Sequence, residues 1–304
     1  FGARDFIEVD PSALQVSPGN EAHLHGFATQ AIDNDGLSRR MYLHTSPEFA
    51  MKKLLAAGEE RLFALTHVWR NRERGALHSP EFTMLEWYRP GLGFAGLMTE
   101  TEEFIRAVAP PIVAHGDATT DLSLPFERIT MAEAFARWCN GLDILGTEGD
   151  TARLHAAAQA AGFTPRADEG WEDLFFRLLL EHIEPQLGRG RATFLTHWPA
   201  PQAALARRDP ADPRAALRFE LFVAGLELAN AFDELTDPAE QRARFIADTA
   251  ERRRISGEHG WEIDEDFLAA LEHGMPATSG IALGFDRLAM LAAGAREIAD
   301  VMWL

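Results

Sequence analysis

The sequence predicts an α+β fold in which an antiparallel sheet is flanked by helices. Residues 61–69 and 80–88 alternate apolar and other side chains on either side of a polar segment, as two paired strands do. Residues 218–234 contain a second pair of this kind. Between the two pairs, residues 130–190 show helical patterns with apolar packing faces. Strand pairs separated by a helical stretch indicate this fold class.

The composition is that of a globular protein. The 304 residues suffice for a sizeable core, and we expect one domain over residues 1–304 with a helical insertion at about 130–190. A net charge of −18 disfavours a broad nucleic-acid footprint. The one cysteine, Cys139, excludes an internal disulfide and fits a reducing cytoplasm. Because no apolar run reaches about 18 residues, we expect no membrane span.

The residues before the first strand pair are predicted to form short strands, loops and one helix. Residues 1–11 read as the end of a helix and a short strand, and residues 12–40 as loop with short strands. After a strand at 41–45, Ser46, Pro47 and Glu48 give ordinary signals for a helix that runs to about Ala57, before Gly58. By this interpretation, Glu48 is a first-turn acid with no further role.

The loop inside the first strand pair is rich in charge. Residues 70–79 are more than a tight hairpin needs, and they carry Arg70, Arg72 and Arg74 as well as His78. Guanidinium groups match the geometry of phosphate oxygens. The loop therefore predicts a bound anion.

The glycines at 91, 93 and 96 match the pattern G-x-G-x-x-G before a helix at 97–109. A dinucleotide site needs a βαβ unit at this point, and none follows, so we reject that interpretation. Residues 110–126 read as a flexible loop. Beyond the helical stretch, residues 192–197 predict a strand and residues 199–213 a loop with four prolines.

Two carboxylates mark the second strand pair. A turn at Ala224-Gly225 places residue 222 opposite 227 and residue 220 opposite 229, so Glu220 and Glu227 become diagonal neighbours on one face. Two carboxylates at this spacing can hold one Mg²⁺. A solvated face is the alternative, although the apolar surroundings indicate burial, and buried carboxylates need partners.

The end of this strand pair carries Asn230, Phe232 and Glu234, which share a face by alternation. Their parity is opposite to that of Glu227. A bulge or a strand end must therefore intervene if all of them serve one site.

Residues 279–288 read as a short buried strand, a glycine turn and a helix that starts near Asp286. Arg287 then lies in the first turn of a helix, where a cation is unfavourable unless an anion is bound. The alternative is a surface arginine paired with Asp286 or Glu297.

These motifs together resemble the class II aminoacyl-tRNA synthetases of the lysine branch. Residues 69–72, WRNR, and 78–83, HSPEFT, are similar to the second signature motif of that family. Residues 279–288 are similar to its third motif and residues 1–11 to the end of its first. Residues 84–90, MLEWYRP, are more similar to a paralogous bacterial family that attaches lysine or β-lysine to a lysine of elongation factor P. The resemblance covers nearly the whole chain and implies the class II synthetase fold.

The resemblance implies activation of an amino acid as its adenylate, with ATP and Mg²⁺ as cofactors. It implies Arg70 and Arg287 as the catalytic residues, on the α- and γ-phosphates, and Glu220 and Glu227 as the magnesium ligands. We expect these four side chains to converge on one triphosphate cradle. The implied ATP-binding residues are Arg70, Asn71, Arg72, His78, Ser79, Phe82, Glu227, Leu228, Gly284 and Arg287. The implied substrate-binding residues are Ser46, Glu48, Glu86, Tyr88, Asn230, Phe232 and Glu234.

The resemblance also implies a cytoplasmic homodimer that uses elongation factor P as acceptor. The acidic charge and Ala282, where the synthetase usually has Gly, favour this acceptor over tRNA, and we hypothesise that Ala282 favours β-lysine. Arg72 and Ser79 depart from the family's Glu and Asn, which puts ATP binding in question. Two alternatives stay open: a lysyl-tRNA synthetase core that charges tRNA, and a synthetase-like binding protein with impaired catalysis.

Overall fold

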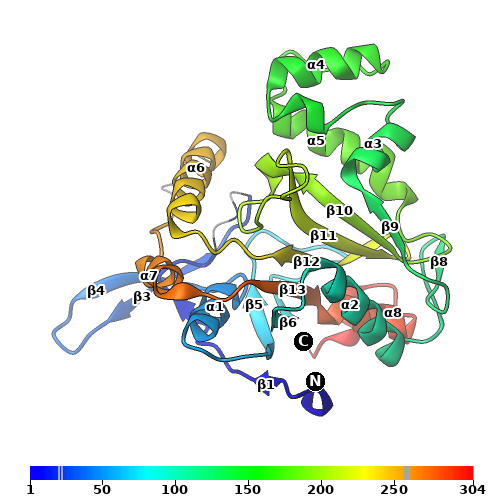
Figure 1. The fold of residues 1–304 in the computed structure, drawn as a ribbon. Helices are drawn as coiled ribbons and strands as arrows, with labels where there is room; N and C mark the ends of the chain where they lie inside the picture. Colours follow the sequence, from blue (N-terminus) through cyan, green and yellow to red (C-terminus); the bar gives the residue numbers. More distant parts are fainter. Residues whose placement is uncertain (20, 22, 257–260, 304) are drawn as a thin grey trace. The chain divides into compact units, whose positions relative to one another are not determined.

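The computed structural model describes residues 1–19, 21, 23–256 and 261–303 (Figure 1). The chain divides into two compact units, and each is described by itself. The first unit combines Phe1–Leu97 with Asp233–Leu304, and the second is Met98–Phe232. The expectation of one domain over residues 1–304 stays a prediction.

The first unit is built on four strands in the order β1, β5, β6, β13. Strand β1 (Ile7–Glu8) is parallel to β5 (Leu62–Trp69), whereas β5 with β6 (Glu81–Pro90) and β6 with β13 (Thr278–Gly284) are antiparallel. The strands predicted at 61–69 and 80–88 are therefore confirmed. Alternation along β5 buries Leu62, as expected for a strand with one face on the core.

A second sheet in this unit joins β2 (Leu14–Gln15), β4 (Ser38–Leu43) and β3 (Phe27–Ile32), in that order. The hairpin of β3 and β4 is longer than the short strands predicted for residues 12–40. Most side chains of β3 are exposed, so the strand carries no apolar alternation for a sequence argument to detect.

The helices of the first unit carry the residues that frame the candidate site. Helix α1 packs against α7, where the rings of Phe49 and Phe267 stack with their centroids 4.6 Å apart. Gly58, with φ of 99°, follows the end of α1, as predicted. The helices are α1 (Glu48–Ala56), α6 (Pro238–Ser256), α7 (Glu265–Gly274), α8 (Phe285–Ala293) and the 3₁₀ helices η1 (Gly2–Arg4) and η6 (Ile298–Val301).

The larger group of strands in the second unit has the order β12, β11, β10, β9. Strands β12 (Leu226–Asp233), β11 (Ala215–Val223) and β10 (Thr193–Pro199) pair antiparallel, and β9 (Glu127–Thr130) pairs parallel to β10. The strand predicted at 192–197 is confirmed as β10. With one parallel pair in each unit, the sheets are otherwise antiparallel, and helices flank them, as the predicted α+β class requires.

Residues 110–126 form a hairpin rather than the predicted flexible loop. Strand β7 (Ile112–His115) pairs antiparallel with β8 (Ala118–Asp121) across a two-residue turn. Four-residue strands are too short for their alternation to stand out from a turn-rich sequence. Helix α2 (Phe94–Val108), predicted at 97–109, leads into this hairpin.

The helices of residues 130–190 cover one side of β9, β10 and β11 within the second unit (Figure 1). Their core is continuous: Phe135 and Phe175 from the helices pack with Leu195 from β10 and Phe222 from β11. The helical elements of the second unit are α3 (Met131–Trp138), η2 (Leu145–Thr147), α4 (Thr151–Ala160), α5 (Trp171–Leu178), the π-helix η3 (Leu179–Ile183), η4 (Glu184–Gln186) and η5 (Ala200–Gln202).

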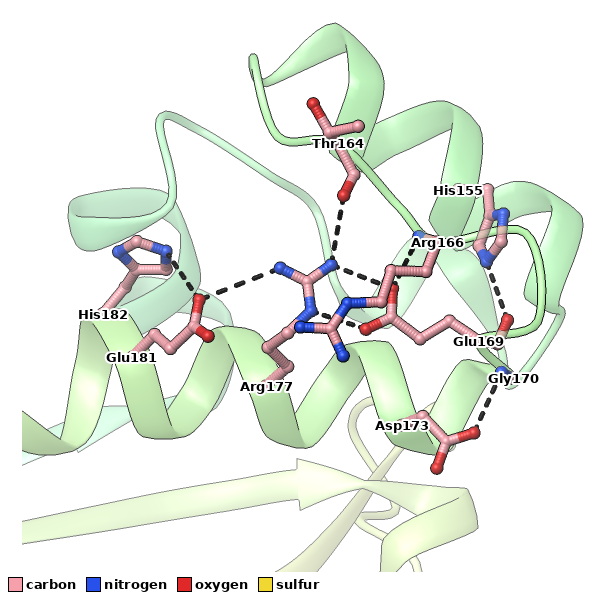
Figure 2. Close-up of polar contacts among 9 residues, drawn as sticks. All are labelled: His155, Thr164, Arg166, Glu169, Gly170, Asp173, Arg177, Glu181 and His182. Carbon is pink, nitrogen blue, oxygen red and sulfur yellow. Dashed lines mark hydrogen bonds and ion pairs between the residues drawn. The ribbon is translucent and has the colours of Figure 1, made fainter.

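A polar network ties these helices together at their outer side (Figure 2). The Glu169 carboxylate accepts hydrogen bonds from Arg177 Nε at 2.5 Å, Arg177 Nη2 at 2.9 Å and the Arg166 backbone at 2.9 Å. Arg177 also lies 3.8 Å from Glu181. None of the helices in the described part of the chain combines the length and the apolar character that crossing a membrane requires.

Candidate active site

The predicted site residues are divided between the two units, and the expected convergence of Arg70, Arg287, Glu220 and Glu227 stays a prediction. The first unit holds Ser46, Glu48, Arg70, Asn71, Arg72, His78, Ser79, Phe82, Glu86, Tyr88, Glu234, Gly284 and Arg287. The second unit holds Glu220, Glu227, Leu228, Asn230 and Phe232.

Strand β6 and the start of α1 bring three predicted substrate residues together. Glu86 and Tyr88 are two residues apart on β6 and therefore share a face, where the Tyr88 hydroxyl donates to Glu86 Oε2 at 3.1 Å. The Ser46 hydroxyl donates to Glu86 Oε1 at 2.5 Å. Its oxygen in turn accepts from the Glu48 backbone N–H at 3.0 Å, next to the helix N-cap at Pro47. Ser46 thus orients a buried acid rather than only starting a helix.

Lys52, which the sequence analysis did not single out, completes this cluster. Its ammonium contacts the Glu48 carboxylate one helical turn away and lies 2.6 Å from Glu234 Oε2. The Lys52 side chain is fully buried. The spacing of Glu48 and Lys52, four residues apart on one helix, was a signal in the sequence. The contact with Glu234, which is 182 residues further along, was not visible there.

Gly280 on β13 leaves the space that the cluster occupies. A Cβ atom at this position would lie 2.4 Å from Glu234 Oε1 and 2.5 Å from Tyr88 Cδ1, distances that no side chain tolerates. Gly280 pairs with Tyr88, and Ala282 pairs with Glu86, in the β6–β13 register. Strand β13 therefore runs directly beside Glu86 and Tyr88 of β6.

We name Glu48, Lys52, Glu86, Tyr88 and Glu234 the acid pocket. Burial raises the pKa of Glu86 to about 8, and the neighbouring charge of Glu48 adds to the rise. Burial likewise raises the pKa of Glu234 to about 8, although Lys52 opposes the rise. Glu234 contacts the Lys52 ammonium, whereas Glu86 has no such partner among the residues that the structure describes, so in the free protein Glu86 is the carboxyl group that holds a proton at neutral pH.

The two predicted catalytic arginines lie near one imidazole. Arg287 Nη2 donates to His78 Nε2 at 2.6 Å, and Arg287 Nε donates to the Leu77 carbonyl at 3.3 Å. Partial burial lowers the pKa of His78; Arg287 and, more weakly, Arg70 add to this, against Glu73. A neutral imidazole can accept from Arg287, and both guanidinium groups are close enough to act on it.

Other predicted ATP-binding residues of this unit lie on the loop after β5 and at the start of α8. The Arg70 guanidinium carbon lies 5.3 Å from the centroid of the Phe82 ring. The Asn71 side chain accepts from the backbone of Arg72, which has a φ of 67°. Gly284 is the N-cap of α8, so Arg287 lies in the first helical turn as predicted. Asp286, considered above as an alternative partner of Arg287, accepts from the Thr83 backbone at 2.6 Å.

A β-bulge on β12 answers the parity question raised by the sequence. Ala224 and Gly225 form the predicted turn, with φ of 50° and 74°, and Phe222 lies opposite Glu227 as predicted. The register then shifts by one residue, so Glu220 lies opposite Asn230 rather than residue 229. The prediction for residue 220 was wrong because an extra residue on β12 stands opposite no partner on β11.

Arg218 is a second site residue that the sequence analysis missed. It donates to Asn230 Oδ1 at 3.1 Å and to Glu220 Oε1 at 2.5 Å, and its guanidinium carbon lies 3.9 Å from the centroid of the Trp198 ring. It also lies 5.9 Å from the centroid of Phe232. Arg218 and Glu220 are two residues apart on β11 and so share a face, which alternation in the sequence could have predicted. The bulge that brings Asn230 to the same face depends on the tertiary structure.

The carboxylates of the second unit fit a divalent cation in their chemistry. Burial raises the pKa of Glu220 well above its usual value, and the charge of Glu227 raises it further. Burial and Glu227 also raise the pKa of Glu184 to about 7. Mutual repulsion of this kind is relieved by a bound cation. Glu220 is buried but Glu227 is exposed, so only one of the two matches the expected burial. Within the described residues, no three His, Cys, Asp or Glu side chains are grouped so as to hold a metal ion by themselves.

Comparison with known proteins identifies the family. The chain matches the family "tRNA synthetases class II (D, K and N)" over residues 1–304. It is 42% identical over 305 residues to the elongation factor P–(R)-β-lysine ligase of Vibrio cholerae, which covers 99% of this chain and 89% of that protein. It is 40% identical over 303 residues to the ligase of the same name from Haemophilus influenzae, with the same coverage. The chain therefore belongs to the class II tRNA synthetases of the D, K and N group.

Proposed function

We propose that this protein is an ATP-dependent ligase that activates lysine or (R)-β-lysine and transfers it to a lysine side chain of elongation factor P. Relatives that match nearly all of the chain carry the name of this ligase. The acid pocket is the observation that carries the proposal, because it gathers three carboxyl groups, and Gly280 lets strand β13 pass close enough to hold Tyr88 and Glu234 in place.

The acid pocket suits a substrate with ammonium groups. An ammonium group buried without partners is costly, and carboxylates that accept its hydrogen bonds remove that cost. The Ser46 and Tyr88 hydroxyls fix the orientation of Glu86, so this acceptor is in place before a substrate arrives. Hydrogen-bond acceptors that are already in place favour a diamino acid over an amino acid of similar shape whose side chain is uncharged.

The chemistry then needs positioning and charge neutralisation. The substrate carboxylate attacks the α-phosphorus of ATP, the bond from that phosphorus to the oxygen bridging the α- and β-phosphates breaks, and pyrophosphate leaves as the aminoacyl-adenylate forms. The acceptor amine next attacks the acyl carbon, AMP leaves, and the amine loses a proton as the amide forms. Arg70 and Arg287 hold phosphate oxygens and neutralise the charge that develops there.

Glu220 and Glu227 would hold Mg²⁺, which supplies further neutralisation of phosphate charge. Arg218 fixes the Glu220 carboxylate from one side, so a cation would meet it from the other. Arg72 and Ser79, which differ from the residues usual in the family, lie on the loop next to Arg70. We expect these two differences to weaken ATP binding.

Two linked assays test the proposal. We expect ATP–pyrophosphate exchange that depends on lysine or β-lysine, and transfer of the labelled amino acid to elongation factor P rather than to tRNA. An Arg287→Ala variant should lose at least about a hundredfold in exchange, because a charge-neutralising donor is removed. Arg254→Ala, an exposed arginine paired with Glu251 on α6, is the matched control and should keep full activity.

Three results would contradict the proposal. Exchange without transfer to elongation factor P, but with transfer to tRNA, would identify a tRNA-charging synthetase. No exchange with either amino acid, together with retained binding of lysine, would identify a binding protein without activation. Full exchange in Arg287→Ala would remove Arg287 from the catalytic residues.

A further inference from the structure

Lys52 stands apart from the other members of the acid pocket because it carries the same charge as the substrate. Its ammonium group is fully buried, touches Glu48, and lies 2.6 Å from Glu234 Oε2. It also lies 5.9 Å from the centroid of the Phe267 ring on α7. A pocket that binds ammonium groups thus already contains one that belongs to the protein.

The two acids keep this ammonium group charged. Burial favours neutral lysine, but Glu234 and Glu48 outweigh that effect and raise the pKa of Lys52 above its usual value. Lys52 is therefore a fixed positive charge at every pH at which the protein would be assayed. It occupies one oxygen each of Glu48 and Glu234, and it leaves Glu86 to the hydroxyls of Ser46 and Tyr88.

The charges of the pocket can be counted. When its three carboxyl groups are ionised, Lys52 offsets one of them and the net charge is minus two. Lysine and β-lysine each carry two ammonium groups besides the carboxylate that reacts. A diamino acid therefore neutralises the pocket, whereas a monoamino acid leaves one buried negative charge without a partner, which is unfavourable.

Asp233 is the other acid next to this cluster. It precedes Glu234 in extended backbone, so its side chain points to the opposite face, where it accepts from the Ser279 hydroxyl at 3.2 Å. The charge of Asp233 also raises the pKa of Glu234, but less than the charge of Glu48 does, and its carboxylate lies outside the acid pocket. Tyr88 is neutral here, because burial and the acids around it raise its pKa well above its usual value.

We propose that Lys52 is a built-in counter-ion that sets the net charge of the acid pocket at minus two and so makes it selective for substrates with two ammonium groups. The inference rests on the proposed function, because it concerns the amino acid which that function activates. Lys52 acts through Glu48 and Glu234, so it is a specificity and positioning residue and takes no part in the reaction itself.

The test is a comparison of two amino acids in one preparation of the enzyme. Lysine and norleucine share the same six-carbon chain, but C6 carries an ammonium group in lysine and is the terminal methyl group in norleucine, which is therefore one heavy atom shorter. The readout is the ratio of kcat/KM for lysine to kcat/KM for norleucine in ATP–pyrophosphate exchange. This ratio does not depend on the fraction of folded enzyme, so a loss of stability alone does not move it.

The variants change the charge count in known steps. Glu48→Gln leaves a net charge of minus one, with Lys52 now repelling the second ammonium group, and should lower the ratio at least about tenfold. Lys52→Met/Glu48→Gln returns the count to minus two and should bring the ratio back to within about threefold of the wild type. Lys52→Arg keeps the charge and is the conservative control, with a ratio close to the wild type.

The inference fails if the double variant has a ratio no higher than Glu48→Gln alone. It fails equally if Glu48→Gln keeps the wild-type ratio. If Lys52→Met/Glu48→Gln does not fold, Lys52→Gln/Glu48→Gln replaces it in the test. This variant has the same net charge, and its two side-chain amides can form a hydrogen bond one helical turn apart. A wild-type enzyme that activates neither lysine nor β-lysine would contradict the proposed function. An active wild type whose variants show lysine-to-norleucine ratios that do not follow the net charge of the pocket would contradict this inference alone.

Discussion

At the scale of single residues, burial makes ionisation of the carboxyl groups in the acid pocket unfavourable, and a bound cationic substrate would make it favourable. Glu86 and Glu234 are almost fully buried, and both have a pKa near 8 in the free protein. Hydrogen bonds to Glu86 from Ser46 and Tyr88 lower its pKa, but burial and Glu48 outweigh them. Such groups change protonation when a cation arrives, so binding and pH are linked.

We expect binding of lysine or β-lysine at pH 7 to release protons. An ammonium group of the substrate lowers the pKa of Glu86, which is protonated in the free protein below pH of about 8. Affinity should therefore rise with pH from about 6 to about 8. Titration calorimetry in buffers of different ionisation enthalpy measures the release, and we expect about one proton per site.

Glu86→Gln is the control for this linkage. It should bind the amino acid more weakly and release fewer protons. The stability of the free protein depends on pH in the opposite direction to the affinity. Because the pKa of Glu86 is about 8 in the folded protein and 4.5 in the unfolded chain, the free energy of unfolding falls as pH rises from about 4.5 to about 8. Glu86→Gln should thus be more stable than the wild type at pH 8, by at least about 1 kcal/mol in urea unfolding. Equal proton release by both proteins would contradict the assignment of the proton to Glu86.

At the scale of elements, small departures from regular geometry decide which side chains meet. The bulge on β12 turns Asn230 toward the side of Glu220, and Arg218 then bonds both. Gly280 gives β13 its close approach to Tyr88 and Glu234. The strands themselves follow from alternation in the sequence, but a bulge depends on a whole sheet, and no local pattern marks it.

In the helical part of the second unit, Arg177 should matter for stability. Its hydrogen bonds lower the pKa of the buried Glu169 to about 2, so this stabilisation is present above pH 4.5 and is lost as pH falls toward 2. Arg177→Met leaves the carboxylate without its main partner (Figure 2), and we expect it to lower the free energy of unfolding by about 2 to 3 kcal/mol at pH 7.

Urea unfolding measures this effect, and Arg153→Met provides the comparison. The Arg153–Glu148 pair is exposed, with 59% and 55% of the side chains accessible, so its loss should cost less than about 1 kcal/mol. A similar loss in the two variants would show that burial does not distinguish these ion pairs.

At the scale of the whole molecule, the net charge of −18 disfavours binding of a nucleic acid. The exposed edge of β1 is relevant to the expected homodimer. Strand β1 is the terminal strand of its sheet, and Ile7 on it is 48% exposed. An edge strand with an apolar side chain is a surface that another chain can cover. The homodimer implied by the family resemblance stays a prediction for this face.

We expect a mass in solution of about 67 kDa by light scattering, which is twice the 33.7 kDa of the chain. Ile7→Lys should shift the mass toward that of a single chain, because it places a charge where apolar contact is expected. Ile7→Val, which keeps an apolar side chain at the same position, is the control and should leave the mass at about 67 kDa. A mass of one chain for the wild type at micromolar concentration would contradict the dimer.

The sequence by itself determined the strand pairs at 61–69 with 80–88 and at 218–234, the start of α8 near Asp286, and the family. Each of these depends on neighbours along the chain: alternation, a turn at Ala224-Gly225, a glycine before a helix. Tertiary structure alone decided that Lys52 meets Glu234 and that Glu220 faces Asn230. Burial and charge act between residues that are distant along the chain, and their effect appears only once the chain has folded.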